Sequence, residues 1–227
     1  MKDIPRKIIV LSHALLTAPL DKIDSPKAVK TVIRAEELAL GAAYRVLKKA
    51  GNGFPGARMA VVFGGDEAID GLKEEYFRGV IAHGAIGASP LLFPYTSLNA
   101  ITAQITIAFG IKGEDMTIAA GPVSFLRALV YACELLKESV VDFALVGGFS
   151  ENAAFAMALQ ASHDAKANGA PELTADCVQP HDIDLYDEVL ITSIEGSFAL
   201  MQRLMEKHGA IKAVDKHGAN VVFMRTK

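Results

Sequence analysis

The sequence has no long apolar run, no signal-peptide pattern and no basic cluster. None of its 227 residues belongs to a run approaching the ~20 apolar residues of a membrane span, and residues 1–5 do not resemble a secretory leader. The net charge is −3, which argues against nucleic acid or an anionic membrane as a partner. We therefore expect a cytoplasmic protein without a membrane span.

Cysteine is scarce as well. Cys133 and Cys177 have neither metal-site spacing nor a secretory context, so neither a zinc site nor a disulfide is supported. Gly64-Gly65 follows an apolar run, but no phosphate-loop lysine pattern or dinucleotide fingerprint comes after it. We expect no metal and no cofactor.

What the chain does contain is typical of an ordered α/β protein. Hydrophobic residues make up 51% of it and charged residues 22%. The apolar residues come in short runs that suit strands covered on both faces, separated by helical patterns, and this order predicts βαβ units and a mainly parallel sheet. We expect one domain over residues 1–227.

The expected elements can be placed from periodicity and from turn residues. One helix is predicted to begin at Ser25-Pro26, with a capping hydroxyl and a proline in its first turn, and to end at Gly51. After Ser150 we expect an irregular region as far as His181. Strands are predicted at 7–12, 59–63, 116–120, 141–147, 189–194, 198–201 and 221–224, and further helices at 69–80, 98–109, 123–137 and 202–208.

The stretch 89–150 contains a succession of short motifs. It runs from Ser89-Pro90, Phe93-Pro94 and Asn99 through an apolar helix to Gly110-Ile111-Lys112-Gly113, then Ala119-Ala120-Gly121-Pro122-Val123-Ser124 and finally Asp142 to Gly148. Cys177-Val178-Gln179-Pro180-His181-Asp182 and Glu195-Gly196 follow later. This order over roughly residues 58–202 resembles the N-terminal half of β-ketoacyl synthases, the condensing enzymes of fatty-acid and polyketide assembly.

The resemblance implies a thiolase-like half-fold, βαβαβαββ, with a mixed, mostly parallel sheet covered by helices. In that family the turn matching 119–124 presents a catalytic cysteine at a helix N-terminus, where the helix dipole lowers the thiol pKa. Here the matching residue is Pro122. The resemblance also implies that the half of the family fold carrying the catalytic histidines has no counterpart in these residues.

Proline in the first helical turn preserves the turn but removes the nucleophile. Ser124 is a candidate replacement, although a hydroxyl at that place more often bonds the free backbone amides. Cys133 lies eleven residues beyond Pro122, about 16 Å along the helix, and is expected to be buried core.

Other positions gain a role only through the resemblance. Leu92, Thr96 and Ser97 match positions that line the acyl tunnel of the family, while Glu67 and Asp70 lie on the helix that carries its chain-length gates. The remaining polar candidates are expected to be solvated, namely His83, His163, His181, His208 and His217 together with Asp182, Asp184, Asp187 and Glu188.

Three functions stay open at this point. The chain could be a chain-length factor, a non-catalytic subunit that forms a heterodimer with a full-length β-ketoacyl synthase and shapes its acyl tunnel, as in aryl-polyene-type pathways. It could instead be a residual acyltransferase or decarboxylase acting on acyl carrier protein thioesters through Ser124 or a histidine. It could also be a homodimer that binds acyl groups or carrier protein.

Overall fold

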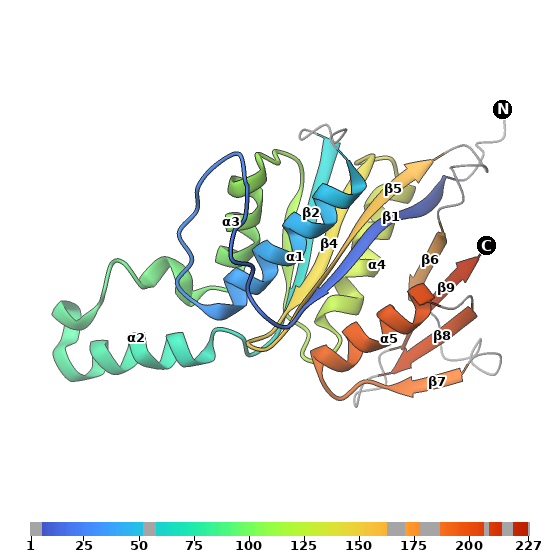
Figure 1. The fold of residues 1–227 in the computed structure, drawn as a ribbon. Helices are drawn as coiled ribbons and strands as arrows, with labels where there is room; N and C mark the ends of the chain where they lie inside the picture. The colour runs from blue at the N-terminus through green and yellow to red at the C-terminus, as the bar shows by residue number, and fades with distance from the viewer. Residues whose placement is uncertain are drawn as a thin grey trace.

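A nine-stranded sheet with helices on both faces forms the protein (Figure 1). The computed structural model describes residues 6–51, 58–162, 171–177, 187–206, 209–214 and 220–226. The strands have the spatial order β3-β2-β4-β5-β1-β6-β9-β8-β7. They are β1 (Lys7–Leu16), β2 (Met59–Gly65), β3 (Asp115–Ile118), β4 (Phe143–Phe149), β5 (Ala154–Ser162), β6 (Glu172–Cys177), β7 (Asp187–Leu190), β8 (Gly209–Val214) and β9 (Asn220–Thr226).

The helices follow the expected alternation with strands. They are α1 (Arg34–Ala50), α2 (Asp70–His83), α3 (Asn99–Phe109), α4 (Ser124–Lys137) and α5 (Ile194–Glu206), with short 3₁₀ turns η2 (Gly84–Gly87) and η3 (Phe93–Thr96). Among the described residues, no helix is both long enough and apolar enough to cross a bilayer.

The order β1-α1-β2-α3-β3-α4-β4-β5 is the predicted βαβαβαββ unit, with α2, η2 and η3 inserted between β2 and α3. Strand β2 is parallel to β3 and β4, whereas β5 is antiparallel to both β4 and β1. Four of these five strands therefore point the same way. The predicted thiolase-like α/β fold with a mixed, mostly parallel sheet is confirmed in this unit, and the strands beyond β1 add mainly antiparallel pairs.

Two hydrophobic cores lie on opposite faces of the sheet. Helices α4 and α5 pack into one core and α1 and α3 into the other. Strand β1 contributes to both: Ile8 and Val10 face α4, whereas Ala14 and Leu16 face α1. Even-numbered residues change sides because a bulge shifts the pairing of β1 between Val10 and Ser12.

The predicted helix start at Ser25-Pro26 is wrong. The hydroxyl of Ser25 donates to the carbonyl of Lys27 instead of capping a helix, and the Lys27 amide donates to the carbonyl of Ala108 in α3. Ile33 is still extended, with φ −128°, so α1 begins only at Arg34. Tertiary bonding to α3 therefore outweighs the local helix signal at Ser25-Pro26.

The true start of α1 depends on Glu36. Its carboxylate accepts the backbone N–H groups of Val32 at 2.6 Å and Ile33 at 3.3 Å through Oε2, while the buried Oε1 has no partner among the described residues. Burial raises the pKa of Glu36 above its usual value near 4.5, and the two backbone bonds oppose that shift.

Glu36→Gln should therefore raise the free energy of unfolding at pH 7. A pKa raised by folding means that the carboxyl group stabilises the protein at low pH and loses this contribution as pH rises through the folded-state pKa. Glutamine keeps one acceptor for the two amides and cannot ionise. Urea denaturation at pH 7 and pH 4.5 checks this: the advantage of glutamine should shrink at pH 4.5, and a lower midpoint at pH 7 would contradict the prediction.

Two later predictions are also wrong. In the described residues the region after Ser150 is not irregular, because β5 pairs with β1 along its whole length and with β4 from Ala154 to Gln160. Its residues are almost all apolar or small because both faces are buried, so no alternation marks it as a strand. The strand pair predicted at 189–201 is instead β7 followed by α5, which buries Ile194, Phe198 and Met201 at helical spacing.

Candidate functional site

The turn at 119–123 connects the edge strand β3 to α4. Gly121 has a left-handed φ of 59°, which glycine adopts without strain, and Pro122 follows it just before the helix. The fully buried hydroxyl of Ser124 accepts the Ala120 N–H at 2.8 Å and donates to the Gly121 carbonyl at 2.6 Å. The Ser124 side chain therefore holds the turn in place.

Strand β2 passes directly beneath this turn. A Cβ atom on Gly64 would overlap the backbone carbonyl group of Ser124 and the amide nitrogen of Phe125. Behind the turn, the hydroxyl groups of Thr102 in α3 and Thr117 in β3 are hydrogen-bonded at 2.6 Å. The start of α4, directly after Pro122, is thus held close against β2, while α3 is bonded to β3.

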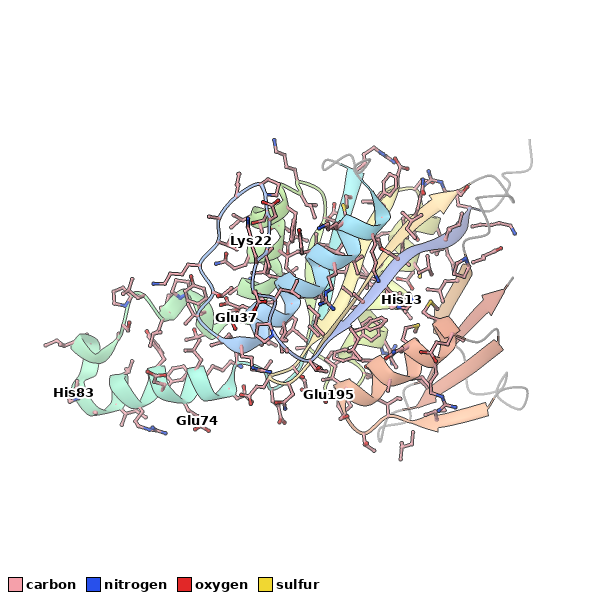
Figure 2. The ribbon with its side chains drawn as sticks, viewed as in Figure 1. His13, Lys22, Glu37, Glu74, His83 and Glu195 are labelled. Carbon is pink, nitrogen blue, oxygen red and sulfur yellow. The ribbon has the colours of Figure 1, made fainter. Side chains whose placement is uncertain are left out.

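A pocket of about 900 Å³ opens at Pro122. It lies at the carboxyl ends of β2 and β4, where residues that follow neighbouring parallel strands meet at one edge of the sheet. The start of α5 forms another wall, and Figure 2 shows Glu195 there, beside the base of α2. The charged residues lining the pocket are all acidic: Asp66, Glu67, Asp70, Glu151 and Glu195.

The carboxylates are not arranged as a metal site. In the described part of the chain, no group of three His, Cys, Asp or Glu side chains is placed to hold a metal ion. The pocket has no cationic side chain among the described residues that line it, so it offers no counter-charge to an anionic group there. It is a polar, negatively charged hollow beside a proline.

The site residues predicted from the sequence fall into two groups. Glu67 and Asp70 line the same pocket as Pro122. Leu92, Thr96 and Ser97 do not: they lie in and around η3, where the Thr96 hydroxyl donates to the Phe93 carbonyl and the Ser97 hydroxyl donates to Asn99 Oδ1. The structure therefore brings together only part of the predicted set.

Sequence reasoning missed the acidic character of the pocket. Asp66 follows β2 directly and Glu151 comes two residues after β4. Because parallel strands end at a common edge, the positions of these carboxylates immediately after the β2 and β4 runs could have predicted their convergence. Glu195, which was expected in a turn between two strands, lies in the first turn of α5.

Several other predicted positions lie outside this pocket or outside the described residues. Cys133 is completely buried in α4, as predicted. His83 is exposed in the last turn of α2. Asp187 and Glu188 lie in β7 and Cys177 in β6, but their side chains are outside the described residues, as are His163, His181, His208, His217, Asp182 and Asp184.

The turn at 119–124 presents no nucleophilic side chain. The proline ring carries none, and the Ser124 hydroxyl is completely buried with its donor and acceptor functions occupied. Covalent catalysis needs a nucleophile that can reach the substrate and a base to activate it. The geometry at 119–124 supplies neither.

The edge of the sheet beside this turn is open. Strand β3 ends the strand order, and only β2 pairs with it among the described strands. Met116 on β3 is an exposed apolar side chain at this edge. Such an edge can pair with a strand of another chain.

Comparison with known proteins identifies the family. The family model described as beta-ketoacyl synthase, N-terminal domain, matches residues 11–169. A curated relative, the PKS-NRPS hybrid synthetase ATPKS of Aspergillus niger, is 26% identical over an alignment of 133 positions that covers 55% of this chain. The matched segment spans only 7% of that protein.

Solved structures share the fold. A ketosynthase (ApeO) in complex with its chain length factor (ApeC) from Xenorhabdus doucetiae has a TM-score of 0.66 at 12% identity, covering 96% of this chain and 99% of that one. The complex AntDE:AntF, a type II PKS acyl-carrier protein with its ketosynthase, gives 0.68 at 12% identity, covering 97% and 99%. The ishigamide ketosynthase/chain length factor gives 0.60 at 17% identity, covering 85% and 80%. The match over residues 11–169 shows that this chain belongs to the family of β-ketoacyl synthase N-terminal domains.

Proposed function

We propose that this chain is a non-catalytic, chain-length-factor-like subunit. It would pair with an active β-ketoacyl synthase in fatty-acid or polyketide biosynthesis of the aryl-polyene type, and it would shape the tunnel that receives the growing acyl chain. Acyl carrier protein would deliver substrate to the pair. The proposal includes no cofactor or metal in this chain.

The observation that carries the proposal is a well-packed turn at 119–124 that presents Pro122, a residue with no nucleophilic side chain. Pro122 stands where the family places its cysteine, while Ser124 and Gly64 maintain the turn in detail. Retention of the scaffold without the nucleophile supports a structural role beside a catalytic partner.

Strand β3 is the proposed pairing surface. Its outer edge has no neighbour among the described strands, and its Met116 is exposed. A partner strand could continue the sheet there through backbone hydrogen bonds. An obligate interface of this kind should bury more than ~2,000 Å² in total.

The tunnel residues remain part of the proposal. Leu92, Thr96 and Ser97 lie together around η3, and Glu67 lines the pocket. Glu67 is exposed, so its charge is solvated in this chain. In a complex it would need a polar or cationic neighbour, which makes it a poor lining for an apolar tunnel and a better contact with the partner.

Co-expression with the full-length ketosynthase encoded nearest to this chain tests the proposal. Size-exclusion chromatography with light scattering should give a stable one-to-one complex, and carrier-protein-bound chain elongation should be lost when this subunit is omitted. A homodimer that does not bind the ketosynthase would contradict the proposal. Thioester turnover by that homodimer would then favour the enzymatic alternative.

Ser124→Ala separates the structural role from residual acyl chemistry. Removing the hydroxyl leaves the Ala120 amide without its acceptor, so the free energy of unfolding should fall by about 1–2 kcal/mol. Any acyl-carrier thioester turnover should not change, because the hydroxyl is buried. The measurements are urea denaturation and thiol release from an acyl carrier protein thioester, and abolished turnover in a folded variant would establish Ser124 as a nucleophile.

A further inference from the structure

The segment containing α2, η2 and η3 stands away from the rest of the protein. Figure 1 shows α2 extending sideways from the sheet, with the return path running back beside it toward α3. We call residues 70–96 the arm. Leu72 is the only buried residue of α2, and η2 and η3 have none, so the arm contributes little to either core.

The arm is nevertheless tightly built. The ring of Tyr76 contacts the rings of Phe77 and Phe93, with centroids 5.5 Å and 5.9 Å apart. The backbones of Gly79 and Gly87 approach so closely that a Cβ on Gly79 would lie 2.8 Å from the Gly87 carbonyl oxygen. The two sides of the arm therefore pack on each other and hold its surface in a defined shape.

That surface is unusually apolar for an exposed region. Five large side chains on the arm are between 55% and 96% exposed: Phe77, Ile81, Ile86, Leu91 and Phe93. Burying each of them would be worth roughly 1.5–3 kcal/mol, and this stabilisation is not realised in the isolated chain. A group of such side chains on one projection marks an interaction site.

Charge indicates which occupant fits. Asp70, Glu74, Phe77 and Ile81 follow one another at helical spacing, so the exposed stripe of α2 is acidic at its base and apolar toward its tip. Figure 2 shows Glu74 on the side of α2 facing away from the sheet. The base of α2 also adjoins the acidic pocket.

The acidic region is distinct from the rest of the chain. Residues 66–83 with Glu151 and Glu195 hold seven carboxylates against two cations, Lys73 and Arg78, whereas the whole chain has a net charge of only −3. Both cations are already paired, Lys73 with Asp70 and Arg78 with Glu74. A second copy of this chain would bring the same carboxylates to the interface and would be repelled.

We propose that the arm is received by the ketosynthase partner, in an apolar groove bordered by basic side chains at the base of α2. This inference rests on the proposed function and names the chemistry of the partner surface. Apolar burial would supply most of the affinity, and the opposite charges would fix the orientation and speed association. The arm would then be the main contact that distinguishes this partner from a second copy.

The double variant Phe77→Ser/Ile81→Ser tests the apolar part against the co-purified ketosynthase. Both side chains are largely exposed, so the thermal midpoint should stay within a few degrees of wild type. The dissociation constant, measured by biolayer interferometry, should rise at least about 100-fold. Leu190→Ser is the matched control, because Leu190 is 60% exposed on β7, away from the arm, and its change should alter the constant less than about 3-fold.

Glu67→Lys/Glu75→Lys tests the charge. It should slow association by about 10-fold at 50 mM salt, and the difference from wild type should largely vanish at 500 mM salt. An unchanged association rate would contradict the proposal that basic side chains border the groove of the ketosynthase.

The outcomes separate the two proposals. A wild-type complex that survives the Phe77→Ser/Ile81→Ser change overturns the inference and leaves the chain-length-factor role intact. If the wild-type chain does not bind the ketosynthase, both the chain-length-factor role and the docking of the arm are contradicted. Self-association lost in the same double variant would show that a second copy, and not the ketosynthase, occupies the arm.

Discussion

Gly64→Ala should lower the free energy of unfolding by at least about 3 kcal/mol or prevent folding altogether. The added Cβ would overlap backbone atoms of Ser124 and Phe125, and backbone cannot rotate away as the end of a side chain can. Strand β2 cannot retreat either, because Gly64 is paired with Ile118 on one side and with Gly148 on the other. The variant thus tests the packing that places Pro122 at the pocket.

Soluble yield and urea denaturation measure the effect. Gly71→Ala is the matched control, because a Cβ there meets nothing within 4 Å. Alanine in the first turn of α2 should raise stability slightly, by about 0.5 kcal/mol, since glycine loses more backbone entropy. If both alanine variants unfolded at the wild-type midpoint, the close approach of β2 to α4 would be refuted.

Phe125→Ala should cost about 3–5 kcal/mol. The ring is completely buried and meets the rings of Phe155 and Phe198 edge-on, with centroids 5.3 Å and 5.5 Å away. These three rings come from α4, β5 and α5, so the cavity left by alanine would loosen the contact between both helices and the sheet. Phe125 also lies in the first turn of α4, which supports the turn at 119–123, so the pocket should lose its shape as well.

Chemical denaturation with two controls checks this second result. Phe125→Leu keeps most of the volume and should cost less than about 1.5 kcal/mol. Phe77→Ala, on the exposed arm, should change the free energy of unfolding by no more than about 0.5 kcal/mol. If Phe125→Ala and Phe77→Ala lowered the free energy of unfolding equally, the three-ring cluster would contribute no more to stability than an exposed ring.

The fold class could be predicted because its signals are local. Buried strands such as β2 and β4 are short apolar runs, and Gly51 and Gly110 follow the last turns of α1 and α3. Motif order then gave the thiolase-like unit through its resemblance to a known family. The errors fell where tertiary contacts compete with local preference, as at Ser25, where the chain bonds to α3 instead of beginning a helix.

The candidate site was only half predictable for a related reason. The resemblance singled out Pro122, Glu67 and Asp70, but it did not point to Glu151 or Glu195. They reach the same hollow from β4 and α5, which are far apart in sequence. The acidity of the pocket is thus a property of the sheet edge, not of any one motif.

The sequence alone determined most of the strands and helices as far as β4, since buried strands and helix ends are marked by local residue types. The interest of Pro122 came from the resemblance to β-ketoacyl synthases. Only the tertiary structure decided that Ser124 is fully buried and bonded to the turn, that five carboxylates converge beside it, and that the arm leaves five large apolar side chains uncovered. The physical reason is that burial and electrostatic surroundings depend on which distant segments meet, and those meetings are set by packing across the whole sheet.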